Sequence, residues 1–158
     1  MKPLKLPKMN SKEVQNLLDQ EKICRIAFRG KDFPYMAPFQ YIRIGNTMYF
    51  HFTNYGRKIQ LVDKDKRVCV SVERFMPDMN QYHFVVLRGQ LERVNDSKET
   101  KEAVHRLVTF GKDNLSENFL AAHGFNKSEG WEAISDDKSL LIYKLEKISE
   151  IFGLKSPL

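Results

Sequence analysis

The stretch 34–53, PYMAPFQYIRIGNTMYFHFT, decides the fold class. Residues 34–44 and 47–53 are rich in aromatic and β-branched side chains, which favour strands. Between them stands Gly45-Asn46, a pair typical of a two-residue hairpin turn. Pro38 cannot donate a ladder hydrogen bond, so its strand should have an edge or a bulge at that point. We therefore expect an antiparallel hairpin within a β-sheet.

The second strand of this hairpin runs into Gly56-Arg57-Lys58, and a short helical pattern follows over residues 59–63. A glycine lets the backbone approach a ligand closely, and a helix N-terminus presents free N–H groups. Arg57 and Lys58 add positive charge at the same place. The combination favours a phosphate ligand, although such a triplet also occurs in solvated turns.

Strand patterns continue on both sides of the hairpin. Gly89 interrupts one of these strands, which predicts a bulge or the close approach of another backbone or of a ligand. A tail over residues 148–154 follows the last strand. The strands outside the hairpin are expected over residues 23–28, 68–73, 82–94 and 139–147.

Two helices are indicated by capping-box patterns, Asn10 with Glu13 and Asp96 with Glu99. Gly111 is expected to end the second helix. Residues 112–132 show weaker patterns, with a short helix over 117–122, and residues 1–9 form a loose arm. Because strands and helices do not alternate, the order favours an antiparallel barrel with a few helices, built as one domain over residues 1–158.

The composition is that of a globular β-rich chain with a mildly basic surface. It has 158 residues, 42% of them hydrophobic, and a net charge of +6. The cations are mixed with acids along the whole chain, so a solvated surface is the first interpretation and a phosphate-bearing small ligand the second. A barrel that binds nucleic acid is a third, with Phe28, Tyr35 and Phe39 as stacking platforms.

Cysteine and histidine positions give no sign of a metal site. Cys24 and Cys69 stand in apolar runs, which suggests reduced core residues in a cytoplasmic protein, with a disulfide between them as the alternative. His83, His105 and His123 are scattered without metal spacing. The sequence shows no membrane-length apolar run, no Ser-His-Asp set and no dinucleotide glycine motif.

Taken in order, five segments of this chain resemble the FMN-binding split-barrel family related to pyridoxamine 5'-phosphate oxidase. The resemblance is clearest over residues 23–73 and points to the nitroimidazole-resistance-like branch of that family. The segments that carry it are Cys24-Arg25-Ile26-Ala27, residues 34–38, residues 48–53, Gly56-Arg57-Lys58-Ile59 and residues 67–72.

The resemblance implies a mainly β fold, an antiparallel six-stranded split barrel with flanking helices. It also implies a homodimer with FMN at the subunit interface. The flavin phosphate would lie on Arg57 and Lys58, with Thr53 as a hydroxyl donor. The remaining cofactor positions that it implies are Ala37, Pro38, Phe39 and Gln40 along the ring, Phe50 and His51 on the strand leading to the phosphate, and Arg88 and Gly89 on the fifth strand.

By the same resemblance, the protein would be an FMN-dependent oxidoreductase that reduces a small nitro- or quinone-like acceptor with NAD(P)H-derived electrons. A flavin-binding module without strong turnover is the alternative. The tail lacks the arginine that would hold the vitamin substrate, which disfavours that reaction. FAD and deazaflavin stay open as cofactors. Trp131 is interpreted as a core or interface residue, with a place over the flavin ring as the alternative.

Overall fold

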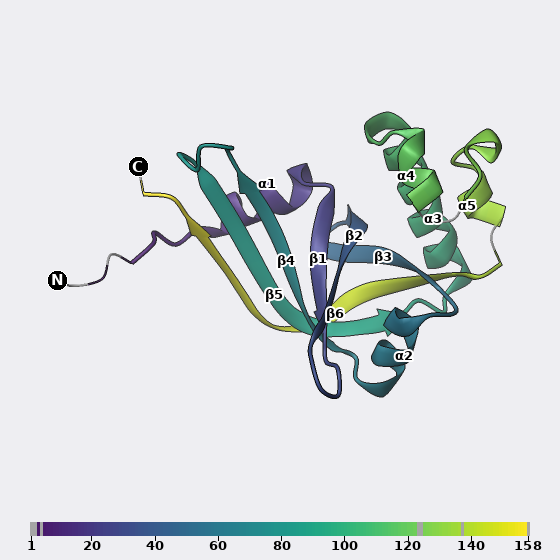
Figure 1. The fold of residues 1–158 in the computed structure, drawn as a ribbon, viewed down its shortest axis with the longest axis horizontal. Coiled ribbons are helices and arrows are strands. Elements are labelled where there is room, and N and C mark those ends of the chain that lie inside the picture. The colour runs from purple at the N-terminus through teal and green to yellow at the C-terminus, as the bar shows by residue number, and fades with distance from the viewer. Residues whose placement is uncertain (1–2, 4, 123–124, 137, 158) are drawn as a thin grey trace.

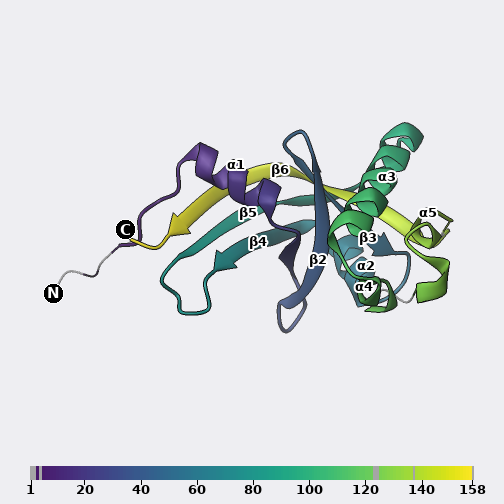
Figure 2. The same cartoon turned by 90° about the horizontal axis from the view of Figure 1, so that it is seen from above.

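The computed structural model describes residues 3, 5–122, 125–136 and 138–157. Strands form one curved body, with α1 at one end and α3, α4 and α5 at the other (Figures 1 and 2). The elements in chain order are α1 (Ser11–Gln20), β1 (Ile23–Phe28), β2 (Tyr35–Ile44), β3 (Thr47–Thr53), α2 (Arg57–Lys64), β4 (Arg67–Phe75), β5 (Tyr82–Arg93), α3 (Ser97–Asn114), α4 (Glu117–Ala122), the 3-10 turn η1 (Lys127–Glu129), α5 (Ala133–Asp136) and β6 (Leu140–Lys155).

The six strands close into an antiparallel barrel in the order β1-β2-β3-β6-β5-β4. The predicted fold class, a mainly β six-stranded antiparallel barrel with flanking helices, is confirmed. The last strand, β6, joins the two ends of the sheet. It pairs with β3 from Leu140 to Lys144 and with β5 from Tyr143 to Lys155.

β2 changes its partner halfway along its length. Residues 35–40 pair with β1, with Pro38 opposite Arg25, and residues 41–44 pair with β3. In the part of the chain that the structure describes, no second strand pairs with residues 35–40. The edge predicted at Pro38 is therefore confirmed, and it leaves one side of this half-strand open.

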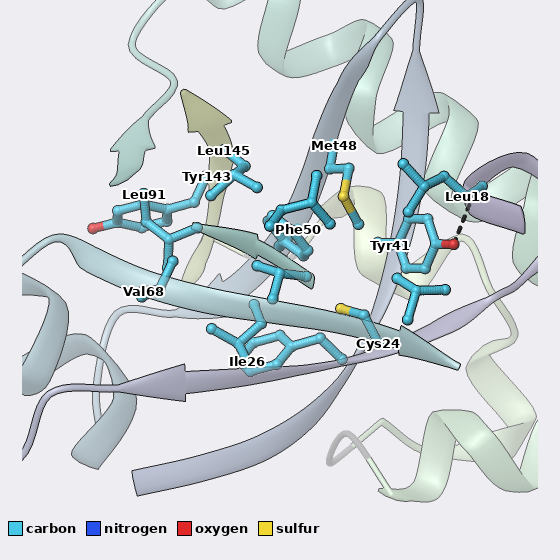
Figure 3. Packing of buried hydrophobic residues seen from close by; sticks show 14 of the residues in the cluster. Leu18, Cys24, Ile26, Tyr41, Met48, Phe50, Val68, Leu91, Tyr143 and Leu145 are labelled. Carbon is cyan, nitrogen blue, oxygen red and sulfur yellow. Dashed lines mark hydrogen bonds between the residues drawn. The ribbon is translucent and has the colours of Figure 1, made fainter. Parts of the chain in front are cut away.

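Aromatic rings fill the barrel. Phe39 and Phe52 lie with ring centroids 5.0 Å apart, and Phe52 contacts Tyr143 at 4.8 Å. Burying a side chain of this size contributes roughly 1.5–3 kcal/mol to folding. Tyr41 also anchors α1, because its hydroxyl donates a 2.7 Å hydrogen bond to the Leu18 carbonyl (Figure 3). These contacts fix the inner face of β2, the strand on which the site depends.

The expectation that Gly111 ends its helix is wrong. α3 continues to Asn114, and Gly111 lies inside it against the ring of Trp131. A β-carbon at this position would lie 2.2 Å from Trp131 Cζ3. Trp131 is buried in a small cluster with Val108 and Leu120, so its interpretation as a core residue is confirmed.

The expected tail over residues 148–154 is also wrong, because β6 is one strand of 16 residues. Residues 7–9 are held against its far end and are no loose arm. The Met9 N–H donates to the Gly153 carbonyl at 2.9 Å, and the Lys155 N–H donates to the Pro7 carbonyl at 3.0 Å. The backbone contact predicted at Gly89 is confirmed, since a β-carbon there would lie 2.8 Å from the Glu146 carbonyl oxygen.

Both cysteines are free, so the alternative of a disulfide is wrong. Cys24 is buried in the barrel, and this burial raises the pKa of its thiol. Cys69 is no core residue. It lies half-buried on the outside of β4, opposite Ala27 of β1 and Arg88 of β5.

None of the helices in the described ranges is long and apolar enough to cross a membrane.

Candidate functional site

The site is built around the first turn of α2. The helix begins at Arg57, two residues before the pattern predicted, and Gly56 precedes it with φ 93° and ψ 179°. Buried Ile59 and Val62 fix the helix against the barrel core. No side chain caps its N-terminus, so the first N–H groups of the helix point out without a side-chain acceptor.

Arg57 and Lys58 each lie over an aromatic ring of β2. Arg57 Cζ lies 5.5 Å from the Tyr35 ring centroid, and Lys58 Nζ lies 4.8 Å from that of Phe39. Neither cation forms an ion pair with a carboxylate of the described residues. Cation–π contacts hold the two side chains without cancelling their charge. Two positive charges therefore stand at the positive end of a helix dipole, which suits an anion.

Thr53 shapes the turn that leads into this helix. Its hydroxyl donates a 2.9 Å hydrogen bond to the Tyr55 carbonyl. The hydroxyl proton is therefore engaged within the turn, and the oxygen stays available as an acceptor. In this structure Thr53 orders the loop in front of Gly56.

The predicted ring-binding positions on β2 divide between two faces. Ala37 and Phe39 are buried, with Phe39 in the barrel core, whereas Pro38 is exposed on the outer face beside Met36, which is 62% exposed. Gln40 is buried under α3, with Nε2 3.5 Å from the Leu107 carbonyl oxygen. A planar ligand on this half-strand would meet Pro38, Met36 and the open main-chain edge.

Phe50 and His51 lie on opposite faces of β3. Phe50 is fully buried inside the barrel, which leaves it no surface for a ligand in this structure. His51 is half-buried on the opposite face of β3, where its residue pairs with Ile142 of β6. Phe50 supports the site from behind, and His51 lies on the outer face of the strand.

Arg88 and Gly89 lie in a neighbouring pocket of about 650 Å³ on the outside of β4 and β5. Arg88 forms a 3.0 Å ion pair with Glu150 of β6. The loop between β1 and β2 lines both this pocket and a second one that contains Arg57, through residues 29, 30 and 32–34. The structure thus gathers Arg57, Lys58, Thr53 and the first half of β2, and it places Arg88 and Gly89 across the loop from them.

Asp65 closes the far end of α2 through ion pairs that the sequence did not predict. Asp65 accepts hydrogen bonds from Arg67 at 2.8 Å and from Arg29 at 3.1 Å, and these cations hold the pKa of its carboxyl well below its usual range. The alternation of Asp65 and Arg67 after a helical pattern was a usable signal. The arrival of Arg29 from another loop had no signal in the local sequence.

Comparison with known proteins identifies the family. A family model described as pyridoxamine 5'-phosphate oxidase matches residues 10–129, most of the chain. Among curated protein sequences, none matches.

Solved structures share the fold at low sequence identity. A FAD-binding protein from Mesorhizobium loti is 20% identical with a TM-score of 0.65, covering 98% of this chain and 100% of that one. A protein from Bacteroides thetaiotaomicron, assigned to 5-nitroimidazole antibiotic resistance, is 17% identical with a TM-score of 0.66, covering 98% and 92%. A FAD-binding protein from Mycobacterium smegmatis is 15% identical with a TM-score of 0.63, covering 96% and 100%.

Proposed function

Because the chain belongs to the pyridoxamine 5'-phosphate oxidase family, we propose that it binds a flavin, FMN, with the phosphate on the first turn of α2. The observation that carries this proposal is the uncapped helix start, with Arg57 and Lys58 unpaired by any described carboxylate. Two of the similar structures are described as FAD-binding proteins, which supports a flavin as the ligand.

The chain's own residues would bind and orient the cofactor. Arg57 and Lys58 hold the phosphate, while Pro38 and Met36 offer an apolar surface to the ring beside the open edge of β2. A bound flavin supplies hydride-transfer chemistry. We propose that this chemistry reduces a small nitro- or quinone-like acceptor with NAD(P)H-derived electrons.

The phosphate assignment is tested by replacing both cations. We expect Arg57→Ala/Lys58→Ala to weaken FMN binding by about 100-fold, because two charge-assisted contacts are lost. The matched control is Lys101→Ala/Arg106→Ala, which removes the same charge from the exposed side of α3. Titration of FMN fluorescence measures both variants. Full flavin occupancy in the Arg57/Lys58 variant contradicts the assignment.

Turnover is a separate question from binding. We expect the flavin-loaded protein to oxidise NADPH in the presence of a nitroaromatic or quinone acceptor. Anaerobic absorption spectroscopy would show bleaching of the flavin by NADPH and its return on addition of the acceptor. A protein that binds FMN but shows neither change is the flavin-binding module of the alternative.

We also propose a homodimer with the cofactor at the subunit interface, in the cytoplasm. Several large apolar side chains are exposed outside the barrel, and exposed apolar surface of this kind is available to pack against a second copy. Light scattering after size-exclusion chromatography tests this, and a monomer that holds FMN tightly contradicts the interface. The exposed residues that support the proposal are Ile23, Met36, Phe75, Met76, Ile148 and Ile151.

A further inference from the structure

A groove of about 730 Å³ follows the exposed side of α2 from its first turn to its last. Arg57, Gln60, Leu61 and Lys64 form one wall, since their spacing of three and four residues places them on one helix face. The loop between β1 and β2 forms the opposite wall. This volume lies in the range of small-molecule sites.

Positive charge dominates the groove. The two carboxylates of the groove differ in their ion pairs. Asp65 is paired with Arg29 and Arg67, whereas Asp32 is not paired with a described cation. Lys31, Arg57 and Lys64 form no ion pair with the carboxylates of the described ranges. The groove therefore carries a net charge that an anionic ligand would balance. Its charged residues are Arg29, Lys31, Arg57, Lys64 and Arg67 against Asp32 and Asp65.

The loop also presents an aromatic ring to solvent. Phe33 lines the groove and is 82% exposed, which is unusual for a side chain of this kind. The backbone of the loop folds closely on itself behind this ring, since a β-carbon at Gly30 would lie 1.9 Å from the Phe33 carbonyl oxygen. An exposed ring beside unpaired cations is a stacking platform suited to a nucleobase.

The groove continues directly from the site on the first turn of α2. Arg57 belongs to both, and Lys64 lies two helical turns further on, roughly 10 Å along the axis. A second set of cations, Lys31 and Lys64, therefore lines the same groove as the phosphate site at the helix start.

We propose that this groove binds an adenylate group, with its phosphate on Lys31 and Lys64 and its purine on Phe33. The proposal rests on the proposed function, because the flavin phosphate at Arg57 occupies the mouth of the groove. The adenylate group belongs to FAD itself or to a separate pyridine dinucleotide that donates electrons. Both sources present the same chemistry to the groove.

The test compares Lys31→Gln/Lys64→Gln with Lys12→Gln/Lys98→Gln, which removes equal charge from exposed positions on α1 and α3. ADP is titrated into flavin-free protein, FAD and FMN are titrated separately, and NADP⁺ is titrated into FMN-loaded protein. We expect the groove variant to weaken ADP binding at least about tenfold and to leave FMN affinity within about threefold. The control variant should weaken neither beyond about twofold.

The titrations with FAD and NADP⁺ distinguish the two sources of the adenylate group, and those with ADP and FMN test the groove separately from the proposed function. A tenfold loss for FAD identifies the adenylate half of FAD, and the same loss for NADP⁺ identifies the electron donor. If the groove variant and the control variant bind ADP with equal affinity, the proposal that the groove binds an adenylate group is overturned. A wild type that fails to bind FMN overturns the proposed function, while the ADP titration still tests the groove by itself.

Phe33 tests the purine separately from the phosphate. We expect Phe33→Ala to weaken ADP binding about tenfold, since a base stacked on an aromatic side chain contributes on this scale. The affinity for inorganic pyrophosphate should stay unchanged. Because Phe33 is exposed, the variant should fold normally. Equal losses for ADP and pyrophosphate, or no loss for either, overturn the stacking role.

Discussion

The helices α1 and α2 begin in opposite ways. At α1 the Asn10 side chain accepts from the Glu13 N–H at 2.9 Å, and the Glu13 carboxylate accepts from the Asn10 N–H at 2.8 Å. At α2 a glycine stands at the cap, no side chain accepts, and two cations occupy the first turn. The first arrangement satisfies the helix dipole, and the second opposes it.

We interpret the start of α1 as one that serves stability and the start of α2 as one that suits a ligand. The start of α3 belongs to the first kind, with Asp96 accepting from the Glu99 N–H at 2.7 Å. The start of α2 lacks a cap and carries cations near the positive end of the helix dipole, and a bound anion would offset both. Departures from optimal stability of this kind are expected at binding sites. Substitutions at the two kinds of helix start should therefore separate binding from folding.

The largest effect is expected for Arg57→Glu/Lys58→Glu. FMN affinity should fall more than about 100-fold, because attraction becomes repulsion. The free energy of unfolding of the flavin-free protein should change by less than about 0.5 kcal/mol, because a better match to the helix dipole offsets the lost cation–π contacts. Flavin titration and urea unfolding measure the two quantities. If the variant loses as much free energy of unfolding as of FMN binding, the start of α2 serves folding as well, and the proposed difference from α1 is wrong.

Gly56→Ala should destabilise the protein by roughly 2 kcal/mol, because φ 93° with ψ 179° is a conformation essentially confined to glycine. No heavy atom lies within 4 Å of the added β-carbon, so the cost is one of backbone conformation. Gly45→Ala is the matched control, with φ 61° and equally open space. It should lose only about 1 kcal/mol in thermal or urea unfolding. Equal losses would mean that the conformation at Gly56 is not the cause.

Asn10→Ala should lower the free energy of unfolding by about 1 kcal/mol and leave FMN affinity unchanged, since the cap satisfies α1 alone. Urea unfolding and flavin titration check both statements. A weaker affinity for FMN in this variant would show that α1 also shapes the site.

The smallest effect concerns Glu99, the acidic residue in the first turn of α3. The hydrogen bond from Lys144, followed by the one from Tyr49, lowers the pKa of Glu99. Burial, followed by the hydrogen bond to Glu99, raises the pKa of Tyr49 to about 12. A lowered carboxyl pKa stabilises the fold above the ordinary pKa of Glu, and this stability is lost as pH falls through the folded value. Because water screens the group, Glu99→Gln should cost roughly 0.5 kcal/mol at neutral pH.

That cost should disappear in acid, where both proteins carry an uncharged side chain. Unfolding in urea at pH 7 and at about pH 3 measures the difference. A deficit that persists unchanged in acid would assign the effect to packing and not to charge.

Most of the barrel strands were predictable because they carry a local pattern, whereas the second half of β6 was predicted as a tail. The alternation in residues 23–28 and 47–53 and the Gly45-Asn46 turn gave bounds that the structure reproduces. Arg57 and Lys58 were identifiable for the same reason, since a strand, a glycine and a helix start are neighbours in the sequence.

The features that the sequence did not predict depend on distant partners. Gly111 was predicted to end its helix because its packing against Trp131 cannot be deduced from the neighbouring residues. The groove cations Lys31 and Lys64 come from a loop and a helix that are separate in the sequence. Phe50 lies on the strand that leads to the phosphate turn, yet its side chain points into the barrel. Only tertiary structure decides which face of a strand is covered.

The position of β6 has a consequence for synthesis of the protein. It is the strand that joins β3 to β5, and it is translated after the other five. The nascent chain therefore carries an open sheet with two unpaired edges until Lys155 has left the ribosome, and its closing contacts are of long sequence range. Barrel closure therefore waits for β6, and chaperones that shield strand edges would act in the interval before it.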